Sequence, residues 1–384
     1  MVLIILNSVS FSCISRIKLI QTANSYTEDN VTRLFRLSIY TVSHFCVDFC
    51  CFYVLYSWYS GGTHSVQTVS AGFLAYNITA FGLQPLIGYL SDTYRKIPTE
   101  VIGCPLLAAG LLFTSVPAVS IILIGLGNAC FHIAGGADSL RQSGGKMAKS
   151  GIFVSSGALG VVSGIIAGKS GRLSAYVPMG ILLVCFILLC ILYKKRMSSE
   201  DEETAFSVTK PNLKFGIIIL FAAVSIAVRS YVGSVLPVEW NTTPVLFLFP
   251  AAGAFLGKAC GGFIADRIGA GRTAVLSLLP AAVLLAFGYM NPYVCITGII
   301  LFNMSMSVTL CAAASVLPLN PGLAFGITTI ALLCGNVPTF FIAAAPAPLT
   351  IAVLTAVSAA CLYYILEGKV KSNQICTVNK QPDV

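Results

Sequence analysis

The sequence predicts an all-α membrane protein in which twelve transmembrane helices form two pseudo-symmetric bundles of six. Mean hydropathy is +0.87, and 57% of the 384 residues are hydrophobic while only 10% are charged, a composition typical of chains embedded in lipid. The apolar runs are continuous and long enough for helices that cross a bilayer of roughly 30 Å. In addition, one sequence motif occurs twice, 174 residues apart, as Gly88 and Gly262 illustrate.

Twelve apolar runs follow one another along the chain, and short polar links separate them. The predicted spans are residues 34–58, 66–90, 98–117, 119–140, 149–168, 173–193, 214–237, 243–265, 273–290, 293–317, 322–344 and 347–366. Residues 1–14 are apolar but too short to cross the membrane, and Arg16 and Lys18 follow this run instead of preceding it as in a signal peptide. That segment has no assignment.

One long polar stretch divides the chain into halves, because it carries the sequences KKR and EDEE between the sixth and seventh spans. We expect it to be a linker on the cytoplasmic side. The predicted organisation is a cytoplasmic N-terminal segment at 1–32, a six-helix bundle at 33–193, the linker at 194–213, a second bundle at 214–367 and a cytoplasmic tail at 368–384.

The positive charges give the orientation. If the N-terminus is cytoplasmic, 19 of the 23 Lys and Arg residues lie in cytoplasmic segments, whereas the outer loops hold only Lys169 and Arg172. The other two, Arg229 and Lys258, lie inside spans. Because Lys and Arg collect on the cytoplasmic side, we expect a multi-pass protein of the cell membrane with both termini in the cytoplasm.

The composition also argues against other classes of protein. The formal charge of +9 comes from short links between apolar runs, so no nucleic-acid partner is expected. The 14 cysteines fall almost entirely in apolar runs without CxxC or Cys/His metal spacing, so no metal or cofactor is predicted. No serine–histidine arrangement, HExxH motif or nucleotide loop predicts an enzyme, and a receptor would not need an internal repeat.

The repeated motif lies where the second and the eighth spans end, as GYLSDTYRK and GFIADRIGAGR. Glycine allows two helices to approach closely, and an aspartate at a helix end with a basic partner can hold one closed state together. The alternative is a set of ordinary loop charges. The residues predicted to control conformational exchange are Gly88, Asp92, Arg95, Lys96, Gly262, Asp266, Arg267 and Arg272.

Two six-helix halves, a central cytoplasmic linker and this GxxxD-plus-basic junction resemble the major facilitator superfamily over residues 33 to about 367. The first copy departs from the family pattern, since Thr93 and Arg95 stand where a basic residue and a glycine are usual. The second copy, with Arg267 and Gly269, matches better. The resemblance implies a secondary transporter, in which two bundles alternate access to a site near the midplane.

The fifth span carries a stripe of small residues that allows close helix packing. The stripe consists of Gly151, Gly157, Gly160, Gly164 and Gly168. All but Gly157 also resemble the antiporter signature of the superfamily, although Ile165 replaces its proline and Lys169 its last glycine. The pattern favours export, and a tight helix pair is the alternative.

The first span contains an ionisable pair, His44 and Asp48, which lie four residues apart and therefore on one helix face. Counted from Arg36 at about 1.5 Å per residue, they lie roughly 12 and 18 Å into the membrane. An aspartate facing lipid there would cost about 2.5–3.5 kcal/mol. We therefore expect the pair to face the interior and to bind protons, with a purely structural pair as the alternative.

Four more polar residues within spans are predicted to contact substrate, namely Arg229, Asn128, His132 and Lys258. Arg229 lies at about the depth of Asp48, and could pair with it, bind an anion, or do both in turn. Two alternatives stay open, because His132 could be a helix–helix contact and Lys258 could snorkel to the inner surface.

The chain looks most like the fosmidomycin-resistance type of facilitator in three short patches. These are the stretch around His132 in the fourth span, His44 with Asp48 in the first span, and the sequence RSYVG in the seventh span. That resemblance implies proton-driven export of small, anionic compounds. The expected function is proton-coupled efflux by antiport, with uptake by symport or uniport as the alternative. The expected partners are a small molecule, protons and the lipid bilayer, and the expected state is a monomer.

Overall fold

The computed structural model describes the backbone of residues 2–62, 64–197, 206–238, 240, 242–243, 245–342 and 346–366. Side chains are described within these ranges from residue 31 onward, except at 195–197. The predictions for the side chains of residues 1–30, for the middle of the linker and for the tail at 368–384 lie outside the described residues.

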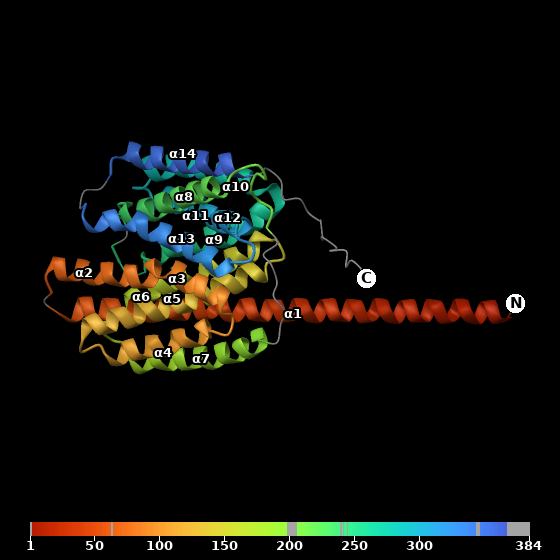
Figure 1. Ribbon diagram of the computed structural model, residues 1–384. Coiled ribbons are helices and arrows are strands. Elements are labelled where there is room, and N and C mark those ends of the chain that lie inside the picture. Colours follow the sequence, from red (N-terminus) through yellow and green to blue (C-terminus); the bar gives the residue numbers. More distant parts are fainter. Residues whose placement is uncertain are drawn as a thin grey trace.

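The two halves of the chain form two bundles of long, roughly parallel helices (Figure 1). The first contains α1 (Val2–Gly61), α2 (Val66–Asn77), η1 (Ile78–Gly82), α3 (Gln84–Thr93), α4 (Thr99–Leu112), α5 (Pro117–Arg141), α6 (Met147–Ser170) and α7 (Tyr176–Met197). The second contains α8 (Phe215–Val235), α9 (Leu248–Ile268), α10 (Ala270–Phe287), α11 (Pro292–Asn303), α12 (Ser305–Ser315), α13 (Pro321–Asn336), η2 (Val337–Phe340) and α14 (Pro348–Ile365).

These elements correspond to the twelve predicted spans. Ten stretches are long and apolar enough to cross a membrane, and α11 with α12, as well as α13 with η2, count as one stretch each. The shorter helix α4 and the interrupted unit of α2, η1 and α3 supply the other two. The prediction of an all-α membrane protein with two six-helix bundles is confirmed.

The second span is interrupted, which the hydropathy pattern does not reveal. Residues 78–82 form a π-helical turn before α3 begins at Gln84. Pro85 has no N–H to donate to the carbonyl of Phe81, four residues earlier. The hydroxyl of Thr329, from the second half, lies 3.3 Å from that carbonyl oxygen and shares its hydrogen with the closer Gly326 carbonyl at 2.8 Å, so the break lies at a contact between halves.

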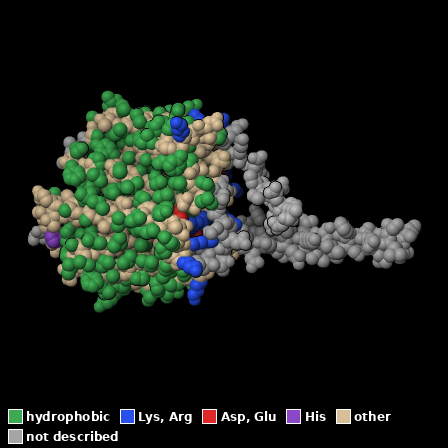
Figure 2. Space-filling view, in the orientation of Figure 1, with side chains coloured by type: hydrophobic (Ala, Val, Ile, Leu, Met, Phe, Trp, Pro, Cys, Tyr) green, Lys and Arg blue, Asp and Glu red, His purple; other side chains and the backbone are tan. Residues whose placement is uncertain are grey.

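A hydrophobic belt surrounds the bundles, as Figure 2 shows for one face, and Lys and Arg gather at the end from which α1 leaves the bundle. We call this the junction end, because the junction aspartates Asp92 and Asp266 lie there. The opposite end is the far end. Large exposed apolar side chains such as Leu112 and Val283 contribute to the belt, since a lipid-facing surface need not be polar.

Two equivalent helix contacts join the halves. α6 packs on α9 and α3 packs on α13, so the fifth span meets the eighth and the second meets the eleventh. The end of the linker also joins the second half, where Lys210 N–H donates to the Ile365 carbonyl at 3.0 Å.

The glycine stripe of α6 lies mainly against α1. A Cβ at Gly164 would lie 3.0 Å from Phe52 Cβ, and one at Gly168 would lie 2.7 Å from the Tyr53 carbonyl oxygen. Gly151 instead faces the other half, because its Cβ would lie 2.7 Å from the Lys258 carbonyl oxygen. Side chains at these positions would therefore separate packed backbones.

Replacing Gly160 tests this packing, because its Cβ would collide with the backbone of Phe45 on α1. We expect Gly160→Leu to destabilise the purified protein by about 1–3 kcal/mol, as overpacking of a close helix contact does. The thermal unfolding midpoint measures the effect. Gly180→Leu is the matched control, because a Cβ at Gly180 meets nothing within 4 Å; equal midpoints for the two variants would contradict the packing role.

Candidate functional site

A cavity of about 280 Å³ lies between the two halves. The first half contributes His44 and Asp48 from α1 and His132 from α5, and the second half contributes Arg229 from α8 and Lys258 from α9. Apolar residues complete the wall, among them Phe81, Val161, Val162, Met306 and Leu332. Five ionisable side chains from both halves thus border one largely apolar space.

Asp48 is the centre of a buried polar cluster. Its carboxylate lies 3.3 Å from His44 Nε2 and 3.6 Å from His132 Nε2, and it accepts a hydrogen bond from Asn128 Nδ2 at 3.0 Å. Asp48, His44 and His132 are only 7%, 5% and 6% exposed. We call these four residues the Asp48 cluster.

The contacts of Nδ1 in His44 and His132 indicate which ring nitrogens carry hydrogens. His44 Nδ1 lies 2.8 Å from the Phe153 carbonyl oxygen and His132 Nδ1 lies 3.0 Å from the Asn128 carbonyl oxygen. A carbonyl oxygen only accepts hydrogen bonds, so each Nδ1 carries a hydrogen. In the neutral rings the lone pair of each Nε2 therefore points at a carboxylate. Each Nε2 therefore attracts the carboxylate only when a proton lies between the two atoms.

Gly157 makes room for this cluster. A Cβ at this position would lie 2.6 Å from His44 Nε2 and would also collide with Asp48. The ring of Phe153 stacks on His44 with centroids 4.7 Å apart. The predicted helix-packing glycine therefore borders the ionisable site itself.

The opposite wall of the cavity is positively charged. Arg229 Nη1 lies 3.3 Å from the hydroxyls of Ser305 and of Thr309 on α12, and Arg229 is only 7% exposed. Lys258 is half-buried and borders the cavity. Among the described residues, no carboxylate lies within 4.0 Å of either cation.

The junction aspartates cap helices of the opposite half. Asp92 accepts hydrogen bonds from the backbone N–H groups of Gly322 at 3.1 Å and Leu323 at 2.9 Å, at the start of α13. Asp266 accepts from Met147 at 2.8 Å and likewise from the next residue of α6. A carboxylate at a helix N-terminus satisfies free N–H groups and the helix dipole, so each half closes the other in the same way.

The junction glycines permit this approach. A Cβ at Gly262 would lie 2.6 Å from the Met147 carbonyl oxygen, and one at Gly88 would collide with the backbone of Gly322. The basic partner of Asp92 is Arg141 of α5, at 2.9 Å. The sequence had suggested a partner in the adjacent loop, at Arg95 or Lys96. Electrostatic attraction also links Asp266 to Lys146.

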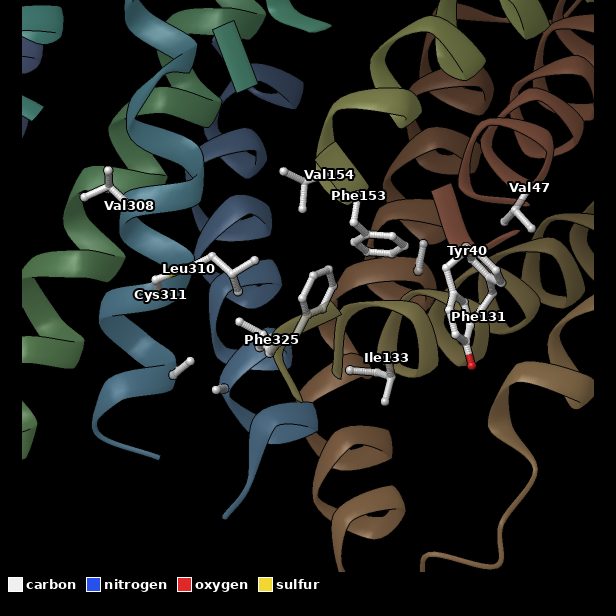
Figure 3. Close-up of a cluster of buried hydrophobic side chains, with 14 of the residues drawn as sticks. Tyr40, Val47, Phe131, Ile133, Phe153, Val154, Val308, Leu310, Cys311 and Phe325 are labelled. Atoms are coloured by element: carbon white, nitrogen blue, oxygen red, sulfur yellow. The ribbon is translucent and has the colours of Figure 1, made fainter. Parts of the chain in front are cut away.

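An aromatic contact joins the two halves beside the cavity, which Phe325 borders. Phe153 of α6 and Phe325 of α13 meet edge to face with ring centroids 6.1 Å apart, and Figure 3 shows the two rings facing each other across the interface. Gly136 of α5 lies directly against the Phe325 ring. The capped helix ends and this aromatic pair together close the junction end.

Sequence reasoning missed one buried ion pair. Arg36 was counted as a cytoplasmic charge, but it is 6% exposed and forms an ion pair with Asp138 of α5, which is 2% exposed. A possible signal was Asp138 itself, a lone acid within the helical run that ends at Arg141.

The same three ionisable side chains of the Asp48 cluster could also hold a metal ion, because their ligand atoms lie within 4.8 Å of one another. Lys258 and Arg229 border the same cavity, and their positive charges oppose a divalent cation there. The twelve described cysteines are free thiols.

The two six-helix bundles and the cavity between them give this chain the fold of the major facilitator superfamily, as two solved structures show. The chain superposes on a point variant of the E. coli fucose:proton symporter FucP with a TM-score of 0.58 and 11% identity, over 86% of this chain and 97% of that one. For FucP in the outward conformation, the TM-score is 0.54 at 12% identity, over 85% and 98% of the chains. No family model and no curated protein sequence matches the chain.

Proposed function

We propose that the chain is a proton-coupled secondary transporter that moves a small molecule across the membrane by alternating access. The observation that carries this proposal is the placement of the Asp48 cluster. It borders a cavity between two halves that helix caps and an aromatic pair hold together. A proton site that shares a cavity with a substrate can couple the two.

The residues take the following roles in this proposal. Asp48 and His44 hold the coupled proton, with His132 and Asn128 completing the cluster on α5, although the sequence had grouped both with the substrate contacts. Arg229 and Lys258 contact the substrate. The junction residues control the exchange between states, since Asp92 and Asp266 hold the closed junction end together.

The rest of the proposal follows the positive charges and the fold. We place the junction end in the cytoplasm, because Lys and Arg gather there (Figure 2). Both termini are then cytoplasmic, and the protein acts as a monomer in the cell membrane without enzymatic activity, cofactor or nucleic acid. We keep as part of the proposal a first bundle at 33–193, a linker at 194–213 and a second bundle at 214–367.

Two directions of coupling compete. The glycine pattern of α6 supports efflux by antiport. The similar fold of FucP, described as a fucose:proton symporter, supports uptake by symport. The two differ in the direction in which protons move relative to the substrate.

Purified protein in proteoliposomes tests the proposal. A panel of small anions, cations and neutral compounds is added outside, and a trapped pH dye reports proton movement. We expect at least one compound to drive proton flux, inward with the compound for symport and outward for antiport. Transport of compounds without any proton flux would refute the coupling and leave a uniporter.

A further inference from the structure

The second half supplies two cations to the cavity and no carboxylate to neutralise them. Among its described residues the only acid is Asp266, and both oxygens of Asp266 already accept the N–H groups of Met147 and Ala148. Arg229 has only the hydroxyls of Ser305 and Thr309 as partners, each at 3.3 Å. These are neutral groups, so they orient the guanidinium without balancing its charge.

The first half does not neutralise these cations by contact either. The carboxylate of Asp48 is already engaged by His44, His132 and Asn128. Lys258 interacts with Asp48 and with Arg229 electrostatically, but no described carboxylate lies within 4.0 Å of it. Burying a cation without a counter-charge is expensive, so the cavity favours an anion from solution.

The remaining residues of the cavity wall indicate the chemical character of the rest of that anion. Phe81, Val161, Val162, Met306 and Leu332 border the cavity. Thr328 and Thr329 of α13 also border it, but their hydroxyls already donate to backbone carbonyls. A space of about 280 Å³ takes a small organic molecule, and its apolar wall favours a hydrocarbon part over a fully hydrated inorganic ion. The anionic group would lie at Arg229 and Lys258, where guanidinium and ammonium recognise oxyanions.

The same arrangement links the anion to the proton. When Asp48 is ionised it attracts Lys258 across the cavity and repels an incoming anion. When the Asp48 cluster gains a proton, that repulsion is removed, so proton and anion strengthen each other's binding. The charged and titratable groups that take part are Asp48 and His44 on α1, His132 on α5, Arg229 on α8 and Lys258 on α9.

We infer that the transported molecule is a small organic anion with an apolar body, held by Arg229 and Lys258, and that it binds together with a proton. This inference rests on the proposed transport function and specifies its substrate class. Two ligands that strengthen each other's binding cross together, so the inference selects symport over the antiport that the glycine pattern favoured.

Ligand binding to the purified protein in detergent tests the inference without transport. The probes share one phenyl ring and differ in charge: benzenesulfonate and benzoate are anions, benzyl alcohol is neutral and benzylammonium is a cation. Each is titrated against the thermal unfolding midpoint, which rises when a ligand binds the folded state. Inorganic phosphate tests whether an oxyanion without an apolar body suffices.

We expect benzenesulfonate and benzoate to raise the midpoint, and the other three probes to leave it unchanged. Benzenesulfonate stays ionised at all pH values used, so its affinity should rise about three- to tenfold as the pH falls from 8.0 to 5.5. Arg229→Gln should weaken its binding about tenfold or more, and Lys258→Gln should weaken it as well. Arg172→Gln is the control, because this arginine lies in an exposed loop.

The outcomes separate the inference from the transport function. Stabilisation by benzylammonium or benzyl alcohol instead of the anions overturns the inference, and so does the failure of both anions in the wild-type protein. If phosphate stabilises the protein as much as benzenesulfonate does, the inference that the anion needs an apolar body is wrong. If the anions bind as expected but no proton flux occurs in proteoliposomes, the anion site stands and the proposed coupling fails. The probe series on the wild-type protein tests the substrate class even if a variant does not fold.

Discussion

Asp48→Asn is expected to abolish gradient-driven accumulation of the transported molecule, at least about tenfold below the wild-type level, while exchange down its own gradient continues. The amide has the shape of the carboxyl group but cannot take up or release a proton in the physiological range. Asp48 is the residue at which His44, His132 and Asn128 converge, so the variant removes the carboxylate that the other three residues contact.

The measurement compares accumulation under an imposed pH gradient with counterflow in the absence of a gradient, both in proteoliposomes. His64→Gln is the matched control, because His64 is the one other histidine of the chain and lies exposed outside the Asp48 cluster. Undiminished accumulation by Asp48→Asn would exclude this residue from coupling, and His132 would be the next residue to test.

The second large effect is expected at the junction. Asp92→Asn replaces a carboxylate that accepts two backbone N–H groups of α13 and pairs with Arg141. Hydrogen bonds to a charged group contribute about 1.5–3 kcal/mol, and part of this is lost in the variant. Because 1.4 kcal/mol is a factor of ten, the population open at the junction end should rise about tenfold or more.

Cys311 reports this opening. It lies on α12 with no exposed surface, next to Ser150 of the first half and near Asp266, so it becomes accessible only when the halves separate there. The labelling rate of Cys311 with a water-soluble maleimide, measured by mass spectrometry on its peptide, should rise in Asp92→Asn. Thr93→Ala, one residue further along on an exposed position, should label like wild type. Ligand affinity measured under the same conditions should change little.

The sequence predicted the fold because length and hydropathy alone determine which runs cross a bilayer. Ten of the predicted spans occur as stretches long and apolar enough to cross a membrane, whereas the π-helical turn at residues 78–82 interrupts the predicted second span. That turn precedes Pro85 and contacts a hydroxyl from α13, and no local pattern contains the second partner. Similarly, α11 ends at Asn303 and α12 begins at Ser305 inside one uninterrupted apolar run.

The sequence was enough to predict which residues belong to the candidate site. It was not enough to predict which residues they contact. His44 and Asp48 share a helix face by spacing alone, and intramembrane charges such as Arg229 stand out because burial is costly. The partners arise from tertiary packing: His132 meets Asp48 across 84 residues of chain. Likewise, Asp92 caps the start of a helix that lies more than 200 residues away in the sequence.

The central claim is that protonation of the Asp48 cluster controls which end of the protein opens, and the pH dependence of Cys311 labelling tests it without a known substrate. Each rate is divided by that of glutathione at the same pH, which removes the titration of the thiol itself. An empty, protonated cavity carries the uncompensated charges of Arg229 and Lys258 and resists closing around them. Ionised Asp48 offsets these charges and eases the exchange.

We therefore predict that the corrected labelling rate of wild-type Cys311 rises about threefold or more between pH 5.5 and pH 8.0. In Asp48→Asn the rate should stay low and independent of pH. The same rise in both proteins would contradict the claim, because protonation elsewhere would then control the opening.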